Sequence, residues 1–572
     1  MDFVFLYGQL KNQVAYAHTY IYSPSGGPVR LSLRRFSTAA KIWVNGQPTV
    51  LNPKDPYAFH KGNITLAKGW NRLLVKLSCA ESTRPEGQNA WISKWRFAAY
   101  LSPQMPATYE TKNIAWMTKL PGFSASSPVV VGDRIFATGG TSDLVCINKQ
   151  DGRIEWLTTA TPCDAATEEE KAAPGYKDKV ESLAASLKQA DEALVAQLNS
   201  LRPLQGLPPN TQSKVDTLIR QKHDLERKLH DALKAIDAKK YVPLYINEVS
   251  PSNATPCTDG KSVYVVMGGG SKGPGAYLFA AYALDGKRLW SYHEALGAAE
   301  HGNHTSPALL DGKLIYGNMS LTIALDAATG KVAWRNELPK NSPNYWEVQN
   351  QVACTFMPYR IGDTAVLIAA PARVIRVADG QTLSQSKKDN VFSALTSPVI
   401  VNGWMYGDGN KSYQAAQLPT SPEDTAKVAW KLDQKDFRLE ASSRYSIASG
   451  IVVNGVGYSV DTMGGLSAID LASQKVLYIR RLEMYQRANR QVFGFTASPA
   501  LGGKFLNIFD NTGCAVVLEP GPEYKEAGRN IIENNVASDW QEYKQELFYS
   551  APVFDGPALY LKGSEYLYCI RP

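Results

Sequence analysis

The chain has 572 residues, a formal net charge of +8 at neutral pH and seven cysteines. This length is too great for one ordinary core, so we expect several domains or one large repeat architecture. The sequence contains no run of about 20 apolar residues and no block of Lys and Arg. This argues against a membrane-spanning helix and against a dedicated nucleic-acid-binding protein.

The first segment, residues 1–105, predicts a separate β-sandwich. Its stretches VRLSLRRF, KIWVNGQPTV and GNITLAKGWNRLLVKLS alternate apolar and polar residues, as half-buried antiparallel strands do. The opening MDFVFLYGQL lacks the basic region and the long apolar run of a secretory signal. The segment has instead the pattern of a strand already under way. We interpret this as a protein that has lost its leader, and we expect a periplasmic or secreted location, with a cytoplasmic protein as the alternative.

Residues 164–240 predict two amphipathic helices that form an inserted helical hairpin. Apolar residues recur at three- and four-residue steps in 180–198 and in 215–236, on either side of the breaker RPLQGLPPN. Thr211 is placed to cap the second helix. We expect this insertion to be a packing element or a docking site for a protein partner, with a mobile lid over a site as the alternative.

The remaining residues, 106–163 and 241–572, repeat one pattern eight times. Each copy starts with a small residue and an apolar strand, as in TSPALLDGKLIYGN (305–318) and TSPVIVNGWMYGDG (396–409). Three further strands follow, separated by an Asp-Gly or Asn-Gly turn, a Gly-rich bend and a D-x-x-x-G-K turn. Four antiparallel strands in about 45 residues, repeated, predict a β-propeller. We predict eight blades, the last completed by a strand within 113–121 so that no edge is free.

The predicted fold class is therefore all-β: an N-terminal β-sandwich followed by an eight-bladed β-propeller with an inserted α-helical hairpin. The repeat phrase ALDAATGKVAW (324–334) and its weaker copies resemble the repeat of quinoprotein alcohol dehydrogenases. They also resemble the non-enzymatic propeller lipoproteins of outer-membrane assembly. The resemblance implies that the Trp ending each fourth strand packs between neighbouring blades. Tyr478 departs from this pattern, whereas the matching positions are Trp116, Trp156, Trp290, Trp334 and Trp430.

The resemblance also bears on cofactors. Enzymatic members cover their quinone with a disulfide between adjacent cysteines and hold a calcium ion beside it. This chain has no Cys-Cys pair, and no calcium ligand set can be placed. We therefore expect no pyrroloquinoline quinone (PQQ); the cofactor is unknown, and a divalent metal stays an open alternative. Cys163 and Cys257 flank the insertion and either pair in an oxidising compartment or stay free.

The N-terminal segment resembles galactose-binding-like sandwich domains, which accompany carbohydrate-active enzymes. The resemblance is carried by WVNG (43–46) and LAKGWNRLLVKL (66–77). We interpret Trp43 and Trp70 as core residues rather than as a platform for sugars.

Candidate catalytic residues lie in loops expected to gather on one face of the propeller, where function usually resides in such folds. His301 and His304 could move protons near neutral pH, and Arg444 and Tyr445 complete the catalytic set. Aromatic side chains suit stacking on sugars, and Arg grips carboxylates. Ordinary surface loops are the alternative. The candidate ligand-binding residues are Glu300, Asn303, Tyr345, Trp346, Arg438, Tyr485, Arg487 and Arg490.

These patterns together predict a binding and scaffold protein that recognises carbohydrate or another small polar ligand, without quinone redox activity. We expect a protein partner at the helical hairpin, and neither nucleic acid nor a membrane span. The alternative is an enzyme with its site on the propeller face: a polysaccharide-lyase-like enzyme acting on acidic glycans, or a degenerate PQQ-dependent dehydrogenase.

Overall fold

The structure is a computed structural model, and it divides into two compact units: residues 1–111 with 486–490, and residues 112–485 with 491–572. The residues that the structure describes are 11–35, 39–49, 59–81, 97–103, 113–140, 142–200, 209–242, 253–268, 275–296, 305–318, 321–337, 355–369, 373–385, 396–409, 412–424, 426–438, 446–462, 464–482, 494–511, 513–532 and 547–572.

The first unit is a β-sandwich, as predicted. One sheet has the order β1 (Lys11–Ser23), β6 (Gly69–Glu81), β3 (Ala39–Val44) and β4 (Gln47–Thr49). The other has the order β5 (Phe59–Leu66), β2 (Gly27–Arg35) and β7 (Phe97–Pro103). Alternate residues of both sheets share one buried core, including Leu31 of β2, Ile64 of β5 and Val75 of β6. A core shared between two sheet faces is what makes this unit a sandwich.

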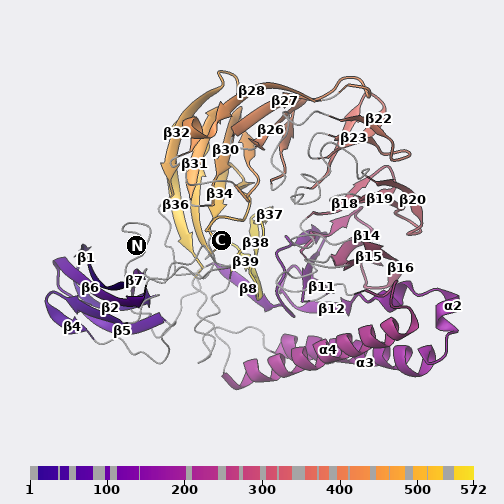
Figure 1. The fold of residues 1–572 in the computed structure, drawn as a ribbon, viewed down its shortest axis with the longest axis horizontal. Coiled ribbons are helices and arrows are strands. Elements are labelled where there is room, and N and C mark those ends of the chain that lie inside the picture. Colours follow the sequence, from indigo (N-terminus) through magenta and orange to yellow (C-terminus); the bar gives the residue numbers. More distant parts are fainter. Residues whose placement is uncertain are drawn as a thin grey trace. The chain divides into compact units, whose positions relative to one another are not determined.

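Seven four-stranded antiparallel sheets of the second unit consist of consecutive strands (Figure 1). Blade 1 has β9 (Val129–Val131), β10 (Arg134–Gly139), β11 (Asp143–Asn148) and β12 (Ile154–Thr159). Blade 2 has β13 (Cys257–Thr258), β14 (Ser262–Gly268), β15 (Gly275–Ala283) and β16 (Arg288–Leu296). Blade 3 has β17 (Ala308–Leu310), β18 (Lys313–Asn318), β19 (Leu321–Asp326) and β20 (Val332–Glu337).

The next four blades repeat this order. Blade 4 has β21 (Met357–Ile361), β22 (Thr364–Ala369), β23 (Arg373–Arg376) and β24 (Thr382–Gln385). Blade 5 has β25 (Val399–Val401), β26 (Trp404–Gly409), β27 (Ser412–Gln417) and β28 (Lys427–Asp433). Blade 6 has β29 (Ile451–Val453), β30 (Val456–Val460), β31 (Gly465–Asp470) and β32 (Lys475–Arg481). Blade 7 has β33 (Ala500–Gly502), β34 (Phe505–Phe509), β35 (Cys514–Glu519) and β36 (Lys525–Ile531).

The eighth blade joins the two ends of the repeat region. Its strands β37 (Val553–Asp555), β38 (Ala558–Lys562) and β39 (Tyr566–Ile570) pair with β8 (Ile114–Lys119), which precedes blade 1 in the chain. Figure 1 shows β8 beside β39, and the register pairs Tyr566 with Lys119 and Ile570 with Ile114. The predicted closing strand is therefore confirmed.

A chain of hydrogen bonds links the starts of the blades. At the equivalent position of successive blades, the backbone N–H donates to the side-chain hydroxyl of the next blade, over 2.9–3.2 Å. These links explain why a small hydroxyl residue opens most repeats. The links run from Ser127 to Thr255, Ser306, Thr355, Ser397, Ser449 and Ser498, and from Ala551 back to Ser127.

Blade 8 interrupts this chain, because Ala551 offers no hydroxyl to the N–H of Ser498. We expect Ala551→Ser to stabilise the protein by about 1 kcal/mol, the usual net contribution of one hydrogen bond. Ser397→Ala, which removes an existing link, should destabilise it by a similar amount. Urea denaturation measures both changes. An Ala551→Val control adds bulk without an acceptor and should show no gain; an equal gain there would contradict the explanation.

The repeat phrase places a glycine beneath a tryptophan of the preceding blade. The indole N–H of Trp290 donates to the carbonyl of Ala327 over 2.8 Å, and a methyl group on Gly330 would lie 2.5 Å from the same indole ring. Gly330 also has a φ of +70°, which favours glycine. Other blades repeat this contact, and the pairs are Trp116 with Gly152, Trp156 with Gly286 and Trp334 with Gly380. The repeat phrase therefore serves to pack neighbouring blades against each other.

The segment after blade 1 is helical. It contains short turns at η1 (Pro162–Ala165), α2 (Glu168–Lys171) and η2 (Tyr176–Glu181), then α3 (Ser182–Ser200) and α4 (Pro209–Ile236), which lie side by side in Figure 1. A further short helix, α6 (Gln434–Phe437), follows blade 5. The predicted cap at Thr211 is wrong, because α4 already begins at Pro209; proline is favoured in the first helical turn. None of the described helices could cross a membrane.

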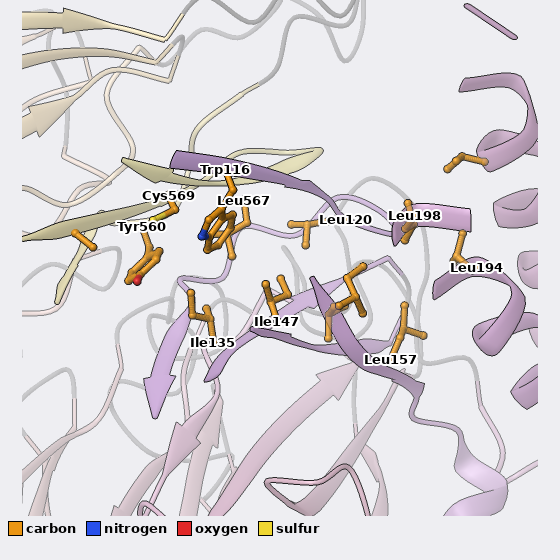
Figure 2. Packing of buried hydrophobic residues seen from close by; sticks show 14 residues of the cluster. Trp116, Leu120, Ile135, Ile147, Leu157, Leu194, Leu198, Tyr560, Leu567 and Cys569 are labelled. Carbon is orange, nitrogen blue, oxygen red and sulfur yellow. The ribbon is translucent and has the colours of Figure 1, made fainter. Parts of the chain in front are cut away.

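Helix α3 extends the core of the first and last blades. Figure 2 shows Leu194 and Leu198 of α3 in one cluster with Ile147 and Leu157 of blade 1 and with Trp116 of β8. The side chain of Asn199 also accepts from the N–H of Ile154 and donates to its carbonyl, each over 2.9 Å. The helix thus covers the edge strand β12, which would otherwise expose unpaired backbone groups.

A buried ionic cluster fixes α4 to blade 1. The ammonium of Lys222, whose side chain is 1% exposed, donates to Asp143 over 2.6 Å and contacts Glu226. Asp191 of α3 lies 4.0 Å from it and accepts hydrogen bonds from Thr159 of β12. Burial raises the pKa of Asp191 to about 7 and raises that of Asp143. Burial alone would lower the pKa of Lys222, but the surrounding carboxylates outweigh it and raise that pKa.

The two cysteines that flank the insertion are free thiols. Cys163 and Cys257 form no disulfide in this structure. Burial raises the pKa of each to about 12, which keeps both thiols protonated at neutral pH.

Candidate functional site

Of the twelve predicted site residues, Arg438 alone lies among the described residues. The others fall outside them, and their catalytic and ligand-binding roles stay predictions. They are His301, His304, Arg444 and Tyr445 of the catalytic set, and Glu300, Asn303, Tyr345, Trp346, Tyr485, Arg487 and Arg490 of the ligand-binding set.

Arg438 follows α6 and connects blades 5 and 6. Its guanidinium is ion-paired with Asp408 of β26 over 2.7 Å, and it donates to the hydroxyls of Ser446 and Ser459. It also lies 4.6 Å from the centre of the Phe437 ring. The residue is only 7% exposed. These contacts give Arg438 a packing role between blades.

The most unusual described surface lies on the sandwich. In the AYAHTYIY segment of β1, the small or aliphatic residues Ala15, Ala17 and Ile21 pack against the core. The residues between them point to the opposite face of the sheet, because successive strand side chains alternate. Tyr16, Tyr20 and Tyr22 are therefore exposed, by 56–59%. A solvent-facing side of an antiparallel sheet is normally polar, so three exposed aromatics on one strand call for an explanation.

Strand pairing extends this surface across the sheet. The register places Tyr22 of β1 opposite Trp70 of β6. Their rings pack edge to face, with the ring centres 5.2 Å apart. Trp43 of β3 is half-buried and lies opposite Leu74 of β6, which in turn pairs with His18 of β1. We call this surface the aromatic face, defined by Tyr16, Tyr20, Tyr22, Trp43 and Trp70.

The interpretation of Trp70 as a core residue is wrong. Its side chain is 70% exposed, because it occupies an outward position of β6, next to the buried inward residue Asn71. Trp43 is half-buried rather than fully in the core. The alternation AYAHTYIY was the signal that could have revealed the face. Sequence reasoning missed it because period two identifies two faces without saying which one is covered.

The geometry of the aromatic face suits an elongated ligand. From Tyr16 to Tyr22 the strand extends about 20 Å, with outward residues about 7 Å apart. Each ring offers an apolar surface for stacking, and each tyrosine adds a hydroxyl that can donate and accept. Within the described ranges, no group of three or more His, Cys, Asp or Glu residues could hold a metal ion. The face therefore supports binding by stacking and hydrogen bonding.

The match to a known family begins at residue 84, inside the first unit, and otherwise covers the first part of the propeller unit. The family model described as outer membrane protein assembly factor BamB matches residues 84–197 and 231–431, more than half of the chain. The chain belongs to this BamB family. The predicted resemblance to PQQ-like repeat propellers is thereby confirmed, and the phrase around Gly330 is part of the matched region.

The solved structures that match this BamB-family chain share little sequence with it. BamB from Moraxella catarrhalis is 13% identical, with a TM-score of 0.34, over 56% of this chain and 94% of that one. Quinohemoprotein alcohol dehydrogenase from Comamonas testosteroni is 10% identical, with a TM-score of 0.47, over 80% of this chain and 76% of that one. These similarities say nothing about activity or ligands. No curated protein sequence matches this chain.

Proposed function

We propose that this BamB-family chain is a periplasmic or secreted binding and scaffold protein that recognises carbohydrate through the aromatic face. The observation that carries the proposal is the row of exposed aromatics on β1 and β6, with Trp70 the most exposed among them. Sugar rings have apolar faces that stack on aromatic side chains and hydroxyls that bond to polar rims. A row of such side chains about 20 Å long matches a chain of linked sugars better than a single small molecule.

The propeller would supply the scaffold. Its eight blades are closed by the pairing of β8 with β39, and its helices α3 and α4 are tied to blade 1 by buried apolar and ionic contacts. Rigid scaffolds of this kind hold binding surfaces of their own unit, such as α3 and α4, in place. The family description names outer membrane protein assembly, which supports a protein partner and a location in the cell envelope. We propose that this partner binds at α3 and α4.

Binding of the whole 572-residue chain to oligosaccharides tests the carbohydrate proposal. A thermal-shift screen should compare neutral and acidic oligosaccharides with PQQ and with divalent metal ions, because a ligand that binds the folded state raises the melting temperature. Calorimetric titration of the best oligosaccharide then gives its affinity. We expect stabilisation by at least one class of oligosaccharide and none by PQQ.

Variants locate the site. The double substitution Tyr22→Ala and Trp70→Ala should weaken binding by at least about 10-fold, since each stacking contact contributes about 1 kcal/mol. The matched control is Leu289→Ala with Val332→Ala, which removes two exposed apolar side chains from the propeller. Unchanged affinity in the aromatic variant, or stabilisation by PQQ alone, would reject the proposal.

A further inference from the structure

The positive charge of the chain is concentrated at its N-terminal end. Residues 1–111 contain 13 Lys and Arg but only 5 Asp and Glu, a formal net charge of +8. The whole chain also carries +8, so residues 112–572 are neutral in sum. A strongly basic segment in a chain that is otherwise neutral indicates that this segment meets an anionic partner.

Part of this charge lies on the aromatic face itself. Arg72 and Lys76 occupy outward positions of β6, where the register pairs them with Tyr20 and Tyr16. The Lys76 ammonium lies 5.3 Å from the centre of the Tyr16 ring, a cation–π distance. Lys41 of β3 pairs with Lys76 from the other side. The cations and the aromatic rings therefore form one surface rather than two.

Among the described residues of these three strands, no acidic side chain lies on the face beside these cations. At the outward positions of β1, β6 and β3 that the structure describes, there is no Asp or Glu. Arg72 and Lys41 are both exposed, so their charges are available to a ligand. A protein surface that only needed to be soluble would normally mix both signs of charge.

We propose that the ligand of the aromatic face is an anionic polysaccharide, one whose sugars carry carboxylate or sulfate groups. This inference rests on the proposed function and specifies its ligand. Sugar rings would stack on Tyr20, Tyr22 and Trp70, while Arg72 and Lys76 bind the acidic groups.

The spacing of the cations favours a glycan over a nucleic acid. Arg72 and Lys76 are four residues apart on one strand, about 13 Å. This suits a polymer with an acidic group on every sugar or every second sugar. A single-stranded nucleic acid carries a phosphate at each nucleotide. Proteins that bind it usually have a continuous basic groove along its backbone. In the part of the face that the structure describes, there are two cations along β6 and one on β3, too few for such a groove.

The test compares one polymer in a charged and a neutral form. Oligogalacturonate and alginate oligosaccharides are titrated into the whole 572-residue chain alongside their methyl esters, which keep the sugar backbone but lose the charge. We expect the acidic forms to bind at least about 10-fold more tightly at 50 mM salt. This preference should shrink as salt rises, because ions screen exposed charges.

Charge-removing variants assign the preference to the face. Arg72→Gln with Lys76→Gln should weaken binding of the acidic forms about 10-fold and leave the methyl esters unaffected. Lys261→Gln with Lys287→Gln removes the same charge from exposed turns of blade 2. This control should change neither the affinity for the acidic forms nor the affinity for the methyl esters. Both control lysines are exposed.

The outcomes separate the two proposals. Equal binding of the acidic and esterified forms would overturn the anionic preference and leave carbohydrate recognition in place. Tighter binding of oligo(dT), or of vesicles containing anionic phospholipid, would overturn the assignment to a polysaccharide. Binding of no oligosaccharide would overturn this inference together with the proposed function.

Discussion

Replacing Lys222 by methionine is expected to destabilise the attachment of α4 to blade 1 by about 3–5 kcal/mol, because removing one partner of a buried ion pair leaves an uncompensated charge. Methionine fills most of the volume of the lysine side chain, so the loss of stability reflects the missing charge rather than a cavity. The carboxylate of Asp143, itself 1% exposed, would lose its 2.6 Å contact with the ammonium. Hydrogen exchange of the α3 and α4 amides should accelerate by about 100-fold or more.

The defect should depend on pH in a defined direction. Without the ammonium, the folded-state pKa values of Asp143 and Asp191 rise further above their usual value of 3.8. A carboxyl group whose folded-state pKa is raised stabilises the fold below the unfolded-state pKa, and that stability is lost as the pH rises through the folded-state pKa. The variant should therefore approach the parent protein near pH 4 and differ most above pH 7.

Lys228→Met provides the control on the same helix. Lys228 pairs with Asp224 at the surface of α4, and exposed pairs contribute little to stability. This variant should exchange like the parent protein at every pH. If both substitutions accelerated hydrogen exchange equally, loss of any lysine of α4 would have the same effect. That result would contradict the specific role of the buried cluster.

The substitution Gly330→Ala in the repeat phrase should lower the free energy of unfolding by about 3 kcal/mol. The new methyl group would lie 2.5 Å from ring atoms of Trp290, so the two blades must move apart or the indole must tilt. The alanine would also have to adopt a φ of +70°, which is energetically unfavourable for a residue with a side chain. Urea denaturation measures the change.

Gly312→Ala separates the two causes. Gly312 belongs to the same blade and has a φ of +68°, but a methyl group there would meet no atom within 4 Å. It should destabilise by about 1 kcal/mol, the cost of the backbone conformation alone. The difference between the two variants measures the contact between blades. Equal losses would mean that the Trp290 ring moves aside without cost.

The sequence by itself determined the propeller and its closure. Strand alternation, turn residues and the phrase ending in Trp334 act over a few residues, and eight copies make the pattern unmistakable. The closing strand could be predicted because the last repeat ends without a fourth strand and 113–121 supplies one. Such features need no knowledge of distant contacts.

Only the tertiary structure decided which side chains are exposed or buried where both outcomes fit the local pattern. In β1 the second sheet packs on the side of Ala15 and Ala17, and this leaves Tyr16, Tyr20 and the neighbouring Trp70 in solvent. Lys222 lies on a helix with many surface lysines, yet packing on blade 1 brings it to Asp143, 79 residues away. Period and composition cannot specify such contacts, because burial is set by whichever element folds back over a face.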